Sequence, residues 1–120
     1  MFRFLRNEGR RFANNVIWSI AGWRAAWATE KTLRQWTIVN VLSATLAFVL
    51  DLTAGERALI LALGLLLLAA ELLNTAIEEV VDYVSSAEHP RAKKAKDCGS
   101  AGVALTALAG GVAWAVVLIG

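Results

Sequence analysis

Residues 58–82 read ALILALGLLLLAAELLNTAIEEVVD. The first thirteen of them, Ala58 to Ala70, contain no polar side chain, and acids appear only from Glu71 onward. A helix needs about 17 to 25 residues to cross a bilayer, and the stretch, which we extend to residues 57–84, is long enough. This stretch predicts a transmembrane helix, and with it an all-α integral membrane protein.

The polar side chains of this stretch lie on one edge of the predicted helix. Glu71, Asn74, Glu78 and Asp82 fall within an arc of about 80° at about 100° per residue. Glu71 lies fourteen residues after Arg57, which is about 21 Å of helix and past the middle of a hydrocarbon core about 30 Å thick. Glu78 lies about 10 Å further along. We expect a polar edge that begins inside the bilayer and ends near the headgroups.

The rest of the chain fits a single membrane domain over residues 1–120. Hydrophobic residues make up 58% of the sequence and its mean hydropathy is +0.55, both high for a soluble domain. Two further apolar segments predict transmembrane helices over 34–52 and 99–119, and residues 85–98 form a predicted loop. A chain of this length that only crosses a bilayer a few times is too small to enclose a site, so we expect oligomers.

The basic residues are distributed unevenly. Seven of the twelve Lys and Arg residues precede residue 35, and four more lie between Arg91 and Lys96. Basic loops stay on the cytosolic side of a membrane, so we expect the N-terminus and the 85–98 loop in the cytosol and the C-terminus on the far side. Apolar spans between the basic clusters argue against nucleic-acid binding.

The N-terminal segment predicts an amphipathic helix over about residues 5–30. Its apolar side chains recur at helical spacing and form one stripe, comprising Phe12, Val16, Ile20, Trp23 and Trp27. A basic, Trp-bearing amphipathic helix lies in the headgroup plane of a membrane. No apolar run follows the basic residues promptly, so we expect no cleavable signal peptide.

The acids of the polar edge predict chemistry at the membrane surface. A charge inside a span is costly and marks a functional site by default, although hydrogen bonding between helices is the structural alternative. A proton path is a second alternative, but Ala58 to Ala70 offers it no polar group. A partly desolvated Glu71 is suited to accept a proton from a lipid hydroxyl. Glu78, nearer water, is suited to bind Mg²⁺. The sequence contains no Walker-type or Gly-rich kinase loop, so any phosphoryl transfer must use a different construction.

Two sequence stretches together resemble the signature of prokaryotic diacylglycerol kinases. Residues 71–82 read ELLNTAIEEVVD, and after thirteen residues 96–101 read KDCGSA. Residues 24–35, RAAWATEKTLRQ, are similar to the junction between surface helix and first span in that family. The likeness covers about residues 10–120. It implies a homotrimer with active sites shared between subunits, in the inner membrane of a bacterium.

The resemblance implies a role for individual residues. Glu71 matches the general base, with Asn74 beside it, and Glu30 and Glu78 match the acids that bind Mg²⁺. The implied nucleotide contacts, besides those two acids, are Arg11, Trp18, Glu88, His89, Lys96 and Asp97. The implied lipid contacts are Arg11, Arg24, Arg34, Gln35, Glu71 and Ser100. The implied reaction transfers the γ-phosphoryl group of Mg-ATP to diacylglycerol, giving phosphatidic acid in phospholipid recycling.

Three positions depart from the pattern of the better-known family members. Trp18 stands where a tyrosine contacts the nucleotide, Ala21 where a lysine is common, and Ala87 replaces an acid beside Glu88. These differences concern the contacts to adenine and ribose and leave the base and metal acids intact. An undecaprenol kinase with the same site is the nearest alternative. A small oligomeric transporter and a membrane scaffold are alternatives of other classes, but a scaffold leaves Glu71 unexplained.

Overall fold

The structure is a computed structural model that describes all residues from Met1 to Gly120. It contains four helices and no strand: α1 (Phe2–Thr29), α2 (Lys31–Val49), α3 (Ala54–Val84) and α4 (Pro90–Ile119). The prediction of an all-α fold is confirmed. The chain divides into two compact units, Met1–Glu30 and Lys31–Gly120.

The first unit is the single helix α1. Its apolar side chains are exposed, among them Phe12, Ile17 and Trp18, and only Ala26 is buried. The rings of Trp23 and Trp27 stack with their centroids 5.9 Å apart, as the predicted four-residue spacing requires. The helix begins at Phe2, three residues before the predicted start at residue 5.

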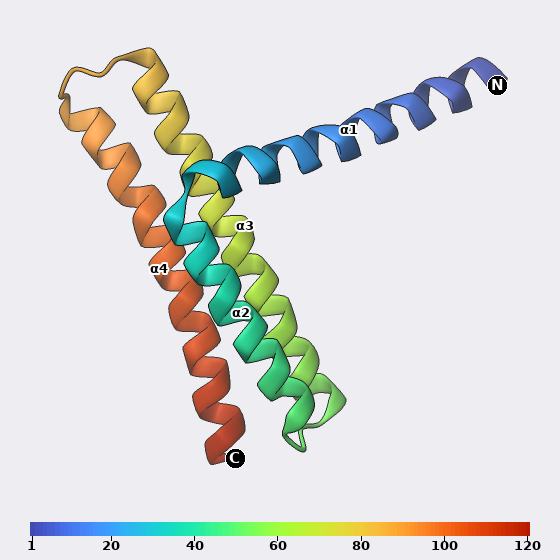
Figure 1. Cartoon of the computed structure of the whole chain (residues 1–120), viewed down its shortest axis with the longest axis vertical. Coiled ribbons are helices and arrows are strands. Elements are labelled where there is room, and N and C mark those ends of the chain that lie inside the picture. Colours follow the sequence, from blue (N-terminus) through green and yellow to red (C-terminus); the bar gives the residue numbers. More distant parts are fainter. The chain divides into compact units, whose positions relative to one another are not determined.

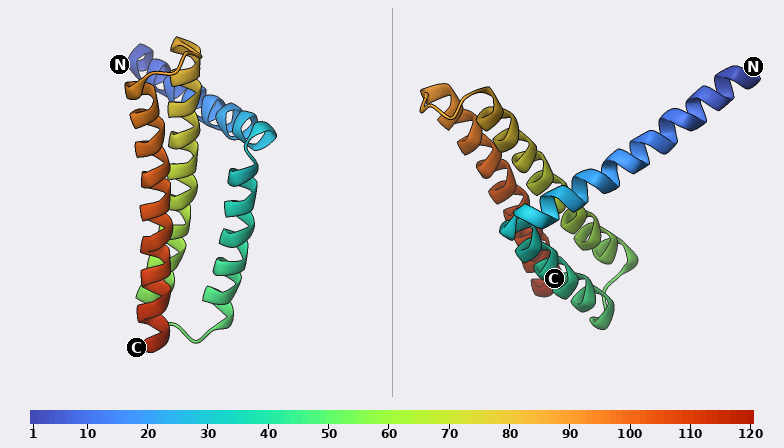
Figure 2. Two further views of the ribbon diagram at one scale, coloured as in Figure 1. Left: turned by 90° about the vertical axis from the view of Figure 1, so that its left-hand side faces the viewer. Right: turned by 45° about the horizontal axis from the view of Figure 1, so that its top comes forward.

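The second unit is a bundle of α2, α3 and α4 (Figure 1). Helix α3 packs against both α2 and α4, whereas α2 and α4 have no close backbone approach. Figure 2 shows α3 and α4 side by side along their length, with α2 standing further off. One side-chain contact nevertheless joins α2 to α4, since the indole Nε1 of Trp114 donates a hydrogen bond to Ser43 Oγ at 2.8 Å.

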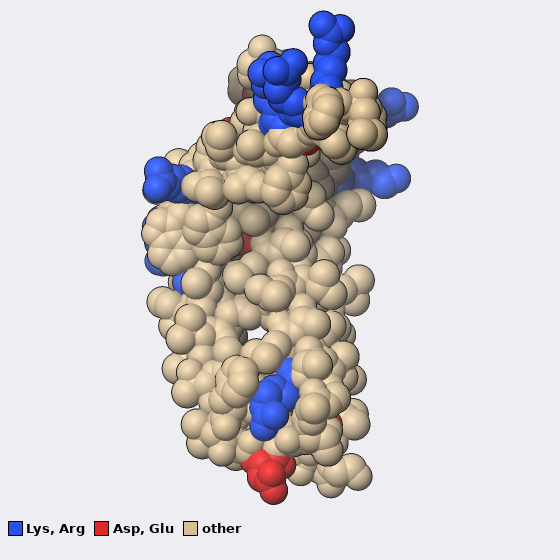
Figure 3. All heavy atoms as spheres, turned by 90° about the vertical axis from the view of Figure 1, so that its right-hand side faces the viewer, with Lys and Arg blue, Asp and Glu red and all other residues tan.

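Helices α3 and α4 are long and apolar enough to cross a membrane, and α2 is not among the helices that qualify. Large apolar side chains of both helices are exposed, including Leu65, Leu66, Leu105 and Leu108. In Figure 3 uncharged side chains cover most of the visible face. A soluble protein seldom exposes so much apolar surface, so these are the features of a membrane protein.

Local sequence signals begin α3 and α4. Thr53 and Glu56 form a capping box, in which Glu56 N–H donates to Thr53 Oγ1 at 3.2 Å and Thr53 N–H donates to Glu56 Oε1 at 2.9 Å. Helix α4 begins at Pro90, where the missing N–H of proline has no helical partner to lose. The predicted loop 85–98 is therefore too long, because only residues 85–89 connect the two helices.

Arg57 closes the turn between α2 and α3. Its Nε donates to the carbonyl oxygen of Ala47 at 2.7 Å and its Nη2 to that of Leu52 at 3.3 Å, while the guanidinium lies 5.5 Å from the centre of the Phe48 ring. Ala47 is fully buried in the last turn of α2, where a carbonyl lacks a partner within the helix.

Replacing Arg57 with Met should therefore lower the free energy of unfolding by about 1–3 kcal/mol, because the buried carbonyl of Ala47 loses its charged donor. Denaturant unfolding of the purified protein in detergent measures the change. The matched control is Arg91→Met, which alters an exposed arginine and should shift stability by less than about 0.5 kcal/mol. Equal stability of the two variants would contradict the role given to Arg57.

Candidate active site

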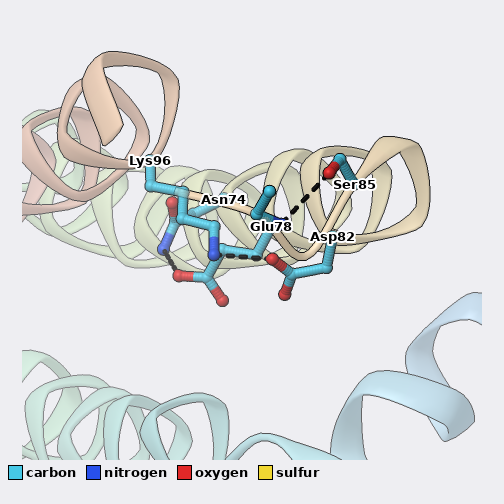
Figure 4. A network of polar contacts seen from close by, with 6 residues as sticks. Asn74, Glu78, Asp82, Ser85 and Lys96 are labelled. Atoms are coloured by element: carbon cyan, nitrogen blue, oxygen red, sulfur yellow. Dashed lines mark hydrogen bonds and ion pairs between the residues drawn. The ribbon is translucent and has the colours of Figure 1, made fainter. Parts of the chain in front are cut away.

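The four polar residues of the edge lie on one uninterrupted helix. Glu71, Asn74, Glu78 and Asp82 all belong to α3, which continues without a break to Val84. In Figure 4 Asn74, Glu78 and Asp82 project from α3 toward the same side. The predicted polar edge is thus present in the folded chain.

Glu71 is the most enclosed member of the edge. Only 4% of its surface is exposed, and it is the only charged residue among the buried ones. Its backbone carbonyl accepts a hydrogen bond from Thr75 Oγ1 at 3.0 Å. Packing within a single chain therefore already removes this carboxyl group from solvent, which is the environment that suits a carboxylate to accept a proton.

Asn74 is held between Glu78 and α4. Its Nδ2 donates a hydrogen bond to Glu78 Oε1 at 3.3 Å, one helical turn further along. Its Oδ1 is buried and has no hydrogen-bond partner. The amide is therefore oriented with its donor toward the Glu78 carboxylate and its acceptor toward the interior of the bundle.

Lys96 extends from α4 to Asp82, the last residue of the polar edge. Its Nζ donates to Asp82 Oδ1 at 2.6 Å, and Figure 4 shows the ammonium on the same side of α3 as the carboxyl groups of Glu78 and Asp82. The hydrogen bond to Asp82 raises the pKa of Lys96 above its usual value, burial opposes this, and the charges of Asp82 and Glu78 add to it. Lys96, which precedes the uncharged stretch of α4, is therefore a permanent positive charge at neutral pH.

A hollow of about 660 Å³ adjoins Asp82 and Lys96. Its wall consists of the end of α3, the connection 85–89 and the first two turns of α4. Four residues predicted from the resemblance to contact a nucleotide line it, namely Glu88, His89, Lys96 and Asp97. The volume is that of a small-molecule site.

Two of these residues have additional contacts. His89 caps α4, because its Nδ1 accepts a hydrogen bond from Arg91 N–H at 3.1 Å, which leaves Nε2 for another partner. Asp97 pairs with Lys93, and this hydrogen bond is the main cause that raises the pKa of Lys93. Lys96 and Asp97 are sequence neighbours, yet each is paired with a different residue.

The remaining predicted residues belong to the N-terminal unit and to other parts of the bundle. Arg11, Trp18, Arg24 and Glu30 belong to the Met1–Glu30 unit, where Arg11 pairs with Glu8 at 3.1 Å and Glu30 ends α1. Arg34 and Gln35 lie in the first turn and a half of α2, with Gln35 exposed, and Ser100 is exposed on α4. The roles of these residues stay predictions from the resemblance.

No group of three or more His, Cys, Asp or Glu side chains gathers to hold a metal ion. Mg²⁺ commonly uses only one or two carboxylates and takes its other ligands from water and substrate phosphates. Glu78 fits that requirement, because its carboxylate lies one helical turn before Asp82, which lines the hollow, and accepts a neutral hydrogen bond from Asn74 at 3.3 Å. The chain's donors are thus compatible with a magnesium ion carried in with a nucleotide.

Asp82 was assigned no role from the sequence, although it lies in the predicted arc. Its position four residues after Glu78 was the available signal, since residues four apart share a helix face. The structure gives it a function as the partner that directs Lys96 toward the polar edge.

Comparison with known protein families gives a match over most of this chain. The family model described as prokaryotic diacylglycerol kinase matches residues 17–118. The chain belongs to the prokaryotic diacylglycerol kinase family. The matched residues include all of α2 and α3 and most of α4, so they contain the entire polar edge and the hollow, and the resemblance predicted from the sequence is confirmed.

Individual members of the diacylglycerol kinase family are similar to this chain over most of its length. The diacylglycerol kinase of Pseudomonas aeruginosa is 48% identical over 92% of this chain and 90% of its own length. That of Escherichia coli strain K12 is 37% identical over 84% and 83%, and that of Haemophilus influenzae is 33% identical over 88% and 89%. The chain is thus similar to whole diacylglycerol kinases.

Proposed function

We propose that this protein is a membrane-embedded lipid kinase that transfers the γ-phosphoryl group of ATP to the hydroxyl of a diacylglycerol, giving phosphatidic acid. One observation supports the proposal most. The polar edge of α3 begins at a buried carboxyl group, Glu71, and ends at a hollow that the ammonium of Lys96 from α4 lines. A lipid needs an apolar approach and a nucleotide an aqueous one, and this edge offers both. The names of the relatives give the substrate.

In the proposed reaction the Glu71 carboxylate accepts the proton of the lipid hydroxyl. The hydroxyl oxygen then bonds to the γ-phosphorus while the bond from that phosphorus to the β–γ bridging oxygen breaks, and ADP leaves with that oxygen. Asn74 keeps the reacting groups aligned beside Glu71, and Lys96 neutralises charge on the phosphates. Positioning and charge neutralisation contribute most of the catalysis in phosphoryl transfer.

Glu78 of the bundle and Glu30 of the N-terminal unit are the proposed holders of Mg²⁺. When bound, the ion neutralises phosphate charge and fixes the position of the transferred group. Glu88, His89, Asp97, Arg11 and Trp18 are the further proposed nucleotide contacts, and Arg11, Arg24, Arg34, Gln35 and Ser100 the proposed lipid contacts. Nε2 of His89 suits this role, because its Nδ1 is already engaged as the helix cap.

We place the protein in the bacterial inner membrane as a three-span homotrimer with shared sites, acting in phospholipid recycling. The distribution of basic residues favours a cytosolic N-terminus and a cytosolic connection between α3 and α4, with the C-terminus on the far side. In this arrangement α2 crosses the membrane together with α3 and α4. Its own hydropathy is weaker, but its hydroxyls hydrogen-bond within the helix, as Thr37 and Thr45 do, which lowers the cost of crossing.

Undecaprenol is the alternative acceptor for the same site. The relatives named above all carry the name diacylglycerol kinase, which favours diacylglycerol. Purified protein should be given Mg-ATP and mixed micelles that contain either lipid, and phosphorylated lipid should be quantified. We expect a kcat/KM at least tenfold higher for diacylglycerol, and the opposite order would replace this proposal with the undecaprenol kinase.

A further inference from the structure

Helix α4 carries a glycine, Gly99, directly against the Asn74 side chain of α3, beside the proposed active site. A Cβ atom placed on Gly99 would lie 2.3 Å from Asn74 Oδ1 and 3.3 Å from Asn74 Cγ. The backbone of Gly99 is helical and its φ is not positive, so conformation does not require glycine there. The lack of a side chain leaves room that the Asn74 amide fills.

The missing side chain at Gly99 also explains why the Asn74 side-chain oxygen is buried without a hydrogen-bond partner. Oδ1 is buried without a hydrogen-bond partner, a state that is rare for buried polar atoms. It lies instead where a side chain at residue 99 would be, and so close to the backbone of α4. Weak Cα–H to oxygen interactions recur at such helix–helix interfaces, and they lower the cost of a buried oxygen without a conventional partner.

With the oxygen held in this recess, the other end of the amide has a defined direction. Nδ2 donates to Glu78 Oε1, so the recess at Gly99 and the carboxylate of Glu78 fix the amide from both ends. A methyl group at residue 99 occupies the recess and forces Oδ1 to move. Because Oδ1 is the end of a flexible side chain, the helices need not separate.

We propose that Gly99 is a positioning residue, which acts on the reaction by holding the Asn74 amide in the orientation that meets Glu78. The inference rests on the proposed kinase function, because it assigns catalytic importance to the direction of that amide. Gly99 stands apart from Gly102, Gly110 and Gly111 of the same helix, where an added Cβ would meet nothing within 4 Å.

The test compares Gly99→Ala with Gly102→Ala, which makes the same change one turn further along α4 in open space. Lipid phosphorylation should fall at least tenfold in kcat for Gly99→Ala, with little change in the KM for ATP, and should stay near wild type for Gly102→Ala. Thermal unfolding of the two variants should agree, since both gain the same helix propensity. Equal activity of the two variants, with wild type active, would overturn the inference.

Two further readouts separate positioning from other effects. In an Asn74→Ala background, Gly99→Ala should cause no additional loss, because the group on which it acts is absent; an undiminished loss would overturn the inference. The side-chain amide resonances of Asn74 should shift in Gly99→Ala and stay in place in Gly102→Ala. This NMR comparison holds even if wild-type protein phosphorylates no diacylglycerol, an outcome that would refute the proposed function instead.

Discussion

Replacing Glu71 with Gln should lower the turnover of diacylglycerol phosphorylation by at least about a hundredfold, the lower end of what a general base contributes. Glutamine preserves the shape and one hydrogen-bond acceptor of the side chain but cannot take up the hydroxyl proton. Glu71 is buried, and an uncharged amide is less costly there than a carboxylate, so the variant should fold and assemble normally. Steady-state kinetics with saturating Mg-ATP and lipid measures the loss.

Glu79→Gln is the matched control for this change. Glu79 lies on the same helix but is exposed, so loss of its charge should change stability by less than about 0.5 kcal/mol and leave turnover close to that of the wild type. Size-exclusion chromatography in detergent shows whether both variants keep the oligomeric state of the wild type. Near-normal activity of Glu71→Gln would mean that another group accepts the proton.

Replacing Lys96 with Met should lower kcat by about a hundredfold or more, the range seen when a charge-stabilising donor is removed from a transition state. The ammonium is the cation that reaches the polar edge from α4, and the raised pKa keeps it charged. Methionine retains the length of the side chain without the charge. Because Asp82 then loses its partner and adds repulsion toward phosphate, we also expect the KM for ATP to rise.

Lys94→Met tests whether the effect belongs to Lys96 or to the basic segment as a whole. Lys94 is exposed and does not line the hollow beside Asp82. Its loss removes the same charge from the same turn of helix, so general attraction to anionic lipid or nucleotide should weaken equally in both variants. If Lys94→Met and Lys96→Met lost activity to the same degree, a specific role for Lys96 would be refuted.

The sequence predicted the polar edge because helical periodicity is a local property. Glu71, Asn74 and Glu78 recur at intervals of three and four, and any continuous helix must place them together. The apolar run before Glu71 likewise predicted a helix able to cross a membrane, and α3 is one, although it begins at Ala54, three residues before the predicted start. These conclusions needed no knowledge of how the helices pack.

What the sequence did not predict depends on contacts between helices. The pairing of Asp82 with Lys96 and the recess at Gly99 arise where α4 meets α3, and spacing along one helix says nothing of its neighbour. The start of α4 at Pro90 was missed for a different reason. Proline and four basic residues in a short segment favour a loop, yet proline is also well suited to the first helical position.

The transfer of labelled phosphate tests the central claim most directly. Purified protein in mixed micelles should be given diacylglycerol, Mg²⁺ and ATP labelled at the γ-phosphorus, and the lipid extract should be analysed for phosphatidic acid. We predict labelled phosphatidic acid with wild type and with Glu79→Gln, and at least a hundredfold less with Glu71→Gln. Consumption of ATP without labelled lipid, or equal labelling by all three proteins, would contradict a lipid kinase centred on Glu71.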